Sequence, residues 1–339
     1  MGTINDHLNL LSKVSWRRLR NASQIFSSYQ RSRATGIPGL KGLPIAISVE
    51  PTTSCNLRCP ECPSGLRSFT RPTGMLKPDL FKKVIDELAD TLMWLTFYFQ
   101  GEPFLHAEFL DMVKHASSRN IYTSTSTNGH YLTGETARET VVSGLDRLII
   151  SIDGTTQEAY ESYRIGGMLS KVIEGTKNVI HWKKKLKSKT PHIVFQFLVV
   201  KPNEQQVPEV RILANELGVD EVMLKTAQIY DYKNGSDLIP DNGRYSRYKR
   251  NSNGTYTIKN HLLNHCWKMW SSCVITWDGK VIPCCFDKDA THVLGNVSRD
   301  SFESIWTSER YQSFRASILK SRSEIEMCTN CTEGTRVWA

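Results

Sequence analysis

The 339-residue sequence lacks any hydrophobic run that could cross a membrane and has no cysteine between Cys62 and Cys266. Its longest apolar run, Ile193 to Val200, is as long as a strand, whereas a membrane span needs about 18 residues. The first residues lack the basic-then-apolar pattern of a signal peptide, so we expect a cytoplasmic protein. With 40% hydrophobic and 23% charged residues, the composition excludes a disordered chain and is typical of a globular protein.

The nine cysteines form a group of three and a group of six. Disulfide frameworks belong to small secreted chains, and this chain has neither property. Tight spacing within each group instead indicates metal sites in a reducing compartment. The first group is Cys55, Cys59 and Cys62, and the second is Cys266, Cys273, Cys284, Cys285, Cys328 and Cys331.

Residues 44–225 alternate between strand and helix patterns. Six short apolar runs predict strands at 45–49, 94–99, 121–126, 147–152, 192–200 and 221–225. A helix pattern lies between each pair, which predicts a parallel α/β sheet with right-handed crossovers. Six such units favour an open partial (β/α)6 barrel. Residues 226–265 are polar and are interpreted as a linker, and residues 266–339 as a small unit organised by metal rather than by a core.

The first 43 residues carry seven basic residues and a single acid, Asp6. They therefore supply six of the nine net positive charges of the chain. Apolar residues recur every three or four positions from Ile4 to Tyr29, which predicts an amphipathic helix that ends near Gly36. The helix could pack on the barrel, or lie peripherally on the inner membrane surface. No nucleic-acid-binding motif accompanies the charge, so we expect no nucleic-acid partner.

The first cysteine group has the spacing Cys55-x3-Cys59-x2-Cys62 in a loop after the first predicted strand. Three thiolates at this spacing can hold one face of a [4Fe–4S] cluster and leave one iron open, because the next cysteine is 204 residues away. Structural zinc is the alternative, but it needs four ligands and no nearby histidine completes the set.

This motif resembles the signature of the radical SAM superfamily. The resemblance implies a [4Fe–4S] cluster whose open iron binds S-adenosylmethionine (SAM), reductive cleavage of SAM to a 5′-deoxyadenosyl radical, and hydrogen abstraction from a substrate. It also implies an electron donor of the flavodoxin or ferredoxin type. The sequence departs from the family at Glu61, where an aromatic residue often packs near the adenine, so that contact is in doubt.

Polar motifs follow the later strands, and the carboxyl ends of barrel strands form the active-site face. By resemblance we expect seven residues to contact SAM: Gly101, Glu102, Pro103, Asn128, Ser151, Asp153 and Arg164. Arg164 would pair with the SAM carboxylate. No side chain stands out as a catalytic acid or base, although Tyr98, Gln196, Lys225 and Gln228 could line the pocket.

The second cysteine group surrounds an expected hairpin turn at Asp278-Gly279. This arrangement resembles the C-terminal SPASM or Twitch extension of radical SAM enzymes, and the resemblance implies one auxiliary [4Fe–4S] cluster. Its ligands would be Cys266, Cys284, Cys328 and Cys331, with Cys273 as an alternative to Cys266. A zinc ribbon is the other possibility.

The sequence thus predicts a metal-binding oxidoreductase with catalytic activity that depends on iron–sulfur chemistry. One hypothesis is oxidation or rearrangement of a small molecule, sugar or lipid headgroup, with the auxiliary cluster as electron conduit. A second is a peptide-modifying maturase. A third, a non-enzymatic iron–sulfur or zinc module, leaves the motifs after the later strands without a purpose.

Overall fold

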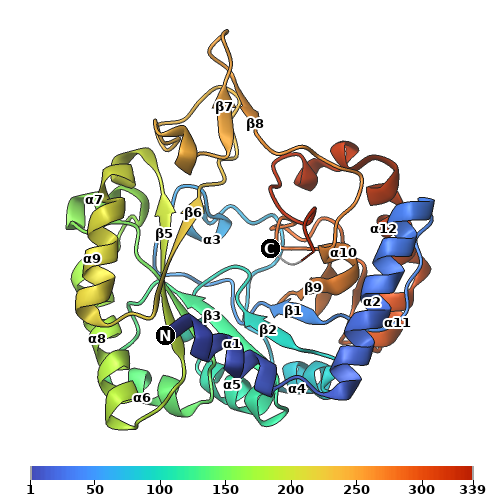
Figure 1. The fold of residues 1–339 in the computed structure, drawn as a ribbon, viewed down its shortest axis with the longest axis horizontal. Helices are drawn as coiled ribbons and strands as arrows, with labels where there is room; N and C mark the ends of the chain where they lie inside the picture. The colour runs from blue at the N-terminus through green and yellow to red at the C-terminus, as the bar shows by residue number, and fades with distance from the viewer. Residues whose placement is uncertain (1, 338–339) are drawn as a thin grey trace.

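The computed structural model describes residues 2–337, which form one nine-stranded sheet and its surrounding helices (Figure 1). The strand order is β11-β10-β9-β1-β2-β3-β4-β5-β6. Strands β1 to β6 are parallel, and their bounds are Ala46–Val49, Trp94–Phe97, Tyr122–Thr127, Arg147–Ser151, His192–Val199 and Glu221–Thr226. All six predicted strands are therefore confirmed, in the order that a partial (β/α)6 barrel requires.

Helices cover the outer face of this sheet because alternate strand residues are apolar and buried. The covering helices are α4 (Pro78–Leu88), α5 (Phe109–Ser118), α6 (Gly134–Val142), α7 (Gln157–Tyr163), α8 (Leu169–Lys185) and α9 (Val207–Leu217). Their apolar faces and the outward strand residues, such as Phe97, Ile150 and Phe197, make the main core. The other strand face lines the barrel interior and is polar, so the chemistry of the protein lies inside the barrel.

The C-terminal unit shares the sheet and core of the barrel. Strand β9 (Ser272–Ile275) pairs in parallel with β1, and β10 (Lys280–Ile282) returns antiparallel to it through the expected turn at Gly279. Strand β11 (Gly295–Asn296), α11 (Phe302–Thr307) and α12 (Glu309–Ser321) complete the unit. Buried residues of this unit, such as Trp306, join the main core, so apolar packing against the barrel also holds the unit that we expected to be organised by metal.

Residues 226–265 are folded and do not form an extended linker. They contain β7 (Tyr248–Arg250) and β8 (Tyr256–Ile258), which project as a hairpin at the top of Figure 1. Tyr248 is buried, stacks on Tyr232 at a centroid distance of 4.6 Å, and donates a hydrogen bond to Asn330. The stacked rings order the segment, and the hydrogen bond to Asn330 attaches it to the C-terminal unit; the polar composition of the segment gives no sign of either contact.

The N-terminal segment forms two helices instead of one. They are α1 (Gly2–Ser12) and α2 (Trp16–Thr35), separated because the Ser15 side chain caps α2 by accepting a hydrogen bond from Arg18 N. Gly36 ends α2 with a φ of +70°, as expected. The buried guanidinium of Arg18 donates to the carbonyls of Ala89 and Arg119, at the ends of α4 and α5. This contact fixes α2 to the barrel.

Among residues 2–337, no helix combines the length and the apolar character that crossing a membrane requires.

Candidate active site

The three cysteines of the first group lie together at the carboxyl end of the sheet. The loop after β1 carries them, and α3 (Pro63–Leu66) begins directly after Cys62. Burial, together with the neighbouring Glu102, Cys59 and Cys62, raises the pKa of Cys55 to about 11. Three thiols on one loop fit one face of an iron–sulfur cluster, because buried sulfur ligands need a cation to stay deprotonated.

A cavity of about 320 Å³ adjoins these cysteines. Five of the seven expected SAM-binding residues line it: Gly101, Glu102, Asn128, Ser151 and Arg164. Pro103 and Asp153 lie behind the cavity wall. The four other residues singled out as possible pocket residues, Tyr98, Gln196, Lys225 and Gln228, also line it. The space and the donor set therefore suit a SAM molecule beside the cysteines.

Arg164 points from the end of α7 toward the first cysteine group. Its Nε lies 2.5 Å from Asp153 Oδ2, and its Nη1 lies 3.8 Å from Cys59 Sγ. Asp153 is fully buried and also accepts a hydrogen bond from Leu198 N, at 2.7 Å. Asp153 therefore positions the guanidinium from behind, which leaves the other face of Arg164 available to an anionic group in the cavity.

Glu102 joins the ends of two strands. Its Oε1 accepts a hydrogen bond from Thr127 Oγ1 at 2.8 Å, and its Oε2 accepts one from Asn128 N at 2.7 Å. Burial raises the pKa of this carboxyl to about 7, although these hydrogen bonds oppose the shift. The side chain thus holds the loop after β3 in place.

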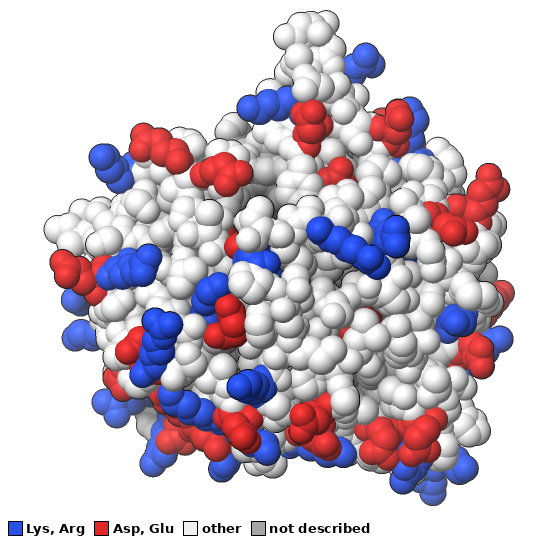
Figure 2. Space-filling model, turned by 180° about the vertical axis from the view of Figure 1, so that it is seen from behind, with Lys and Arg blue, Asp and Glu red and all other residues white. Residues whose placement is uncertain are grey.

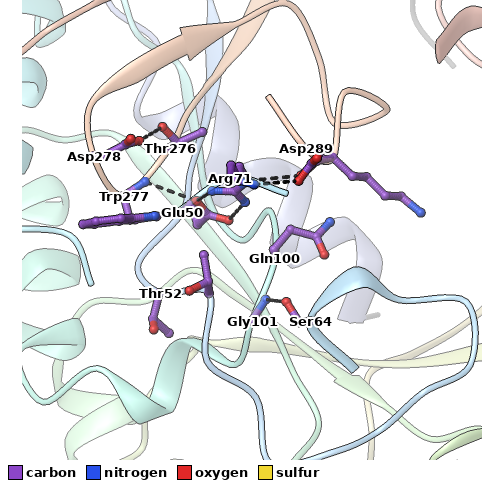
Figure 3. A network of polar contacts seen from close by, with 12 residues as sticks. Glu50, Thr52, Ser64, Arg71, Gln100, Gly101, Thr276, Trp277, Asp278 and Asp289 are labelled. Atoms are coloured by element: carbon purple, nitrogen blue, oxygen red, sulfur yellow. Dashed lines mark hydrogen bonds and ion pairs between the residues drawn. The ribbon is translucent and has the colours of Figure 1, made fainter. Parts of the chain in front are cut away.

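Gly101 allows the loop after β2 to approach the cluster loop. Its φ is +75°, and a Cβ here would overlap the carbonyl oxygen of Thr52. Its N–H donates to Ser64 Oγ at 2.9 Å, as Figure 3 shows. Only glycine fits this backbone position.

A buried ion pair, which the sequence analysis missed, joins the cluster loop to the C-terminal unit (Figure 3). Arg71 donates to both oxygens of Glu50, at 2.9 and 2.5 Å, and Trp277 N donates to the same carboxylate at 3.2 Å. Asp289 accepts hydrogen bonds from the backbone of Thr70 and Arg71. These contacts hold residues 67–74 against β1 and the hairpin β9–β10.

Four cysteines of the second group gather near α10 (Lys268–Ser271). Cys266 and Cys328 share an apolar cluster with part-buried Cys284, and each thiol raises the pKa of its neighbours in this group. The buried Arg322 donates to Cys331 Sγ at 3.2 Å. A guanidinium beside four thiols suits a site that carries net negative charge when it holds a metal centre.

Cys273 lies apart from this group. It is on β9, paired in register with Ile47 of β1, and packs in the main core. The geometry therefore favours Cys266 over Cys273 as a ligand. Cys285, the other spare cysteine, faces the cavity beside Glu333 and Lys288, so the auxiliary site borders the same cavity as the first cysteine group.

Comparison with known proteins identifies this pair of sites. The chain matches the radical SAM superfamily over residues 49–222 and the SPASM iron–sulfur cluster-binding domain over residues 266–332. The protein belongs to the radical SAM superfamily. The cofactors of this enzyme are accordingly a [4Fe–4S] cluster and SAM, and the SPASM match decides the second site in favour of iron–sulfur over zinc.

Relatives and solved structures agree with this assignment. The chain is 29% identical over 313 residues to a tungsten-containing aldehyde ferredoxin oxidoreductase cofactor-modifying protein of Pyrococcus furiosus, covering 84% of this chain and 86% of that protein. It is 28% identical over 204 residues to a PqqA peptide cyclase of Bradyrhizobium diazoefficiens, covering 59% of this chain and 51% of that one.

Two solved structures share the fold. BtrN in complex with AdoMet and 2-DOIA has a TM-score of 0.53 and 19% identity, and the match covers 88% of this chain and 96% of BtrN. Streptococcus suis SuiB bound to S-adenosylmethionine has a TM-score of 0.64 and 12% identity, over 92% of this chain and 77% of SuiB. Both matches support the partial barrel with its C-terminal extension.

Proposed function

We propose that this radical SAM enzyme oxidises a substrate that carries a carboxylate or phosphate group, bound in the cavity between the barrel and the SPASM unit. The SAM-bound cluster supplies the radical that abstracts hydrogen. The observation that carries the proposal is the convergence of three cations, Lys225, Arg247 and Lys288, on the cavity without a direct ion pair to any acidic group of the described residues.

The three cations come from different parts of the chain. Lys225 is the second-last residue of β6, Arg247 directly precedes β7, and Lys288 follows the hairpin β9–β10. Within residues 2–337, no acidic group forms an ion pair with any of them, and the Lys288 ammonium lies over the ring of Tyr230, 4.7 Å from its centroid. Convergence of three segments on one space is typical of a binding site.

Arg247 is the most informative of the three. Its Nη2 donates to Thr226 O at 2.8 Å, whereas its Nη1 is buried and has no hydrogen-bond partner. A buried donor without an acceptor costs about 1–3 kcal/mol, more when charged. An anionic substrate group would supply that acceptor and offset the cost on binding.

Arg164 also lines the cavity but does not belong to this set of three cations. Its expected role is to hold the SAM carboxylate near Cys59, and it already has Asp153 as a partner. The three cations lie toward Glu333 and Cys285 of the SPASM unit. A substrate held there would lie between the SAM pocket and the auxiliary site.

This position supports a two-electron oxidation. Removal of one hydrogen atom from the substrate leaves one further electron and one proton to be lost. The auxiliary [4Fe–4S] cluster would accept the electron, and a cavity-lining carboxylate, Glu61 or Glu333, would accept the proton. The small-molecule, sugar or lipid-headgroup hypothesis needs no further recognition domain.

A peptide maturase is the second candidate. The PqqA peptide cyclase relative, and solved structures of SuiB bound to its precursor peptide SuiA, favour it. An acidic side chain of a peptide would satisfy the same three cations, so this candidate differs from the first in the size of the substrate and not in the recognised group.

The test compares cells that carry the wild-type protein with cells that carry Cys59→Ser, by mass spectrometry of the small-molecule, lipid and peptide fractions. We expect a carboxylated or phosphorylated species to accumulate when Cys59 is replaced. The fraction in which it appears distinguishes a small molecule from a peptide. A changed species without an anionic group would refute the proposed substrate class.

Purified variants test the cations themselves. With the species identified above as substrate, Lys225→Met and Lys288→Met should each raise KM by about tenfold, because each loses one charged contact worth 1.5–3 kcal/mol at most. SAM affinity should stay within about twofold of wild type. Lys189→Met, at an exposed position on the surface, is the matched control and should change neither value.

A further inference from the structure

Helix α1 packs on the barrel with its polar face inward. Asp6 is buried, accepts a hydrogen bond from Tyr122, and pairs with Arg147 at 2.6 Å. Asn9, on the same side of the helix, and Lys13, directly after its last residue, both bind Asp146. These contacts lie at the amino ends of β3 and β4, so α1 closes the lower end of the barrel through hydrogen bonds and ion pairs.

The apolar side of α1 is consequently exposed. Ile4, Leu8 and Leu11 recur at helical spacing and have exposed fractions of 64%, 58% and 64%. At about 100° per residue they lie opposite Asp6 and Asn9. The expected apolar stripe therefore exists, and the helix packs on the barrel, as one of the two alternatives expected, but α1 does so through its polar face.

The start of α2 continues this exposed apolar surface. Trp16 is 78% exposed and Leu19 is 49% exposed. Figure 1 shows α1 in front of the sheet and α2 in front of α11 and α12, so both helices lie on the near side of the molecule. We call the five residues the N-terminal apolar face: Ile4, Leu8, Leu11, Trp16 and Leu19.

Basic side chains of α2 lie beside this face, and one of them, Arg17, pairs with the exposed Asp90 at 2.6 Å. Asp6 is the single acid among residues 1–43, and it is buried. Arg20 and Arg31 are exposed, lie on the same side of α2 as Trp16, and form no ion pair with any residue from 2 to 337. The opposite side of the molecule differs, because Figure 2 shows acidic and basic side chains interspersed there.

We propose that the N-terminal apolar face docks on an anionic lipid surface. Exposed leucines and a tryptophan next to unpaired arginines have the composition of an interfacial helix, with apolar residues entering the acyl boundary and cations contacting lipid headgroups. A second copy of this chain fits less well. A two-fold contact through the same face would bring Arg20 and Arg31 of both copies together.

The position of the N-terminal apolar face also determines how a docked enzyme would be oriented on the lipid surface. The face lies at the amino ends of the strands, whereas the cavity opens at their carboxyl ends, near α3 in Figure 1. A docked enzyme would therefore present its cavity away from the lipid. The face is a tether that places the enzyme at a membrane, and the substrate enters from the aqueous side.

Sedimentation with lipid vesicles tests this proposal on the full chain loaded with its clusters. Vesicles of phosphatidylcholine with about one-third phosphatidylglycerol should bind the protein, and pure phosphatidylcholine vesicles should bind it far less. Leu8→Ser combined with Leu11→Ser should lower the partition coefficient by about tenfold or more. Ile212→Ser, at a 58% exposed position on α9, is the matched control and should bind as wild type does.

A second pair of variants tests the charges. Arg20→Gln combined with Arg31→Gln should weaken binding by about thirtyfold, since each basic residue contributes on the order of 1 kcal/mol near an anionic surface. Formation of 5′-deoxyadenosine from SAM should be unchanged in all variants, which shows that they remain folded.

Three outcomes would overturn the proposal. One is absence of binding to the anionic vesicles. Another is binding that Leu8→Ser with Leu11→Ser leaves intact. The third is a dimer in solution that this double variant dissociates, which would make the face an interface between copies of the chain.

Discussion

The Arg71→Met substitution should strongly destabilise the enzyme. The side chain of Glu50 has no exposed surface, and Arg71 supplies two of its three hydrogen bonds. Removal of the guanidinium leaves a buried carboxylate with Trp277 N as its remaining donor. Breaking a buried pair in this way costs about 3–5 kcal/mol. Burial already raises the pKa of Glu50, so part of the loss would be relieved by proton uptake.

The assay is urea unfolding of the anaerobically loaded protein, followed by circular dichroism. Lys114→Met is the matched control, because Lys114 pairs with Asp111 at the surface and such pairs contribute about 0–1 kcal/mol. Glu50→Gln combined with Arg71→Met should recover part of the loss, since no buried charge remains. A free energy of unfolding for Arg71→Met within about 1 kcal/mol of wild type would refute the reasoning.

Three further predictions concern the cofactor sites. The wild-type chain should hold about eight irons, Cys266→Ser should lose about four, and Cys273→Ser should keep all of them, as iron analysis after anaerobic reconstitution would show. The Kd for SAM should rise as the pH falls from about 8 to 6. The reason is that Glu102, whose pKa is about 7, becomes protonated and loses an acceptor that holds the loop after β3. In the Glu102→Gln variant the Kd for SAM should not change over this pH range. Gly101→Ala should abolish measurable SAM binding in equilibrium dialysis, since its Cβ would overlap Thr52, whereas Gly134→Ala, with open space around it, should bind normally.

The sequence was sufficient to predict the barrel, because strands and helices alternate along the chain and their apolar residues recur at different spacings. Phe81, Val84, Ile85 and Leu88 repeat at helical spacing and are all buried on α4. The motif residues were found for a related reason, since the carboxyl ends of parallel strands meet at one edge. That rule brings Gly101, which follows β2, and Ser151, which ends β4, to one cavity, although they lie 50 positions apart in the chain.

Contacts between segments that lie far apart in the chain could not be predicted from the sequence. Nothing in the pattern around Arg71 indicates that its partner is Glu50 or that Asp289 lies beside it. The polar segment 226–265 was interpreted as a linker although Asn253-Gly254, with φ of +84° at the glycine, is a strong hairpin signal. Lys288 and Arg247 were missed as cavity residues for the same reason, because each reaches the cavity from a loop.

Periodicity also does not determine which side of a helix is buried. The spacing of Ile4, Leu8 and Leu11 indicates a two-sided helix, and burial of the apolar side is the usual outcome. In α1 the polar side docks because Tyr122 and Arg147 offer it buried hydrogen bonds at the end of the barrel. Which side a helix buries depends on the surface that receives it, and that surface is built by residues more than 100 positions away.

The most direct test of the central claim is reductive SAM cleavage by the anaerobically reconstituted protein, measured as 5′-deoxyadenosine after addition of dithionite. Wild type should form 5′-deoxyadenosine and methionine in equal amounts, and Cys59→Ser should form neither. Cys284→Ser should still cleave SAM, because its expected cluster is the auxiliary one. Cleavage that persists in Cys59→Ser, or that is absent from wild type with a full complement of iron, would contradict the assignment of this site as a radical SAM centre.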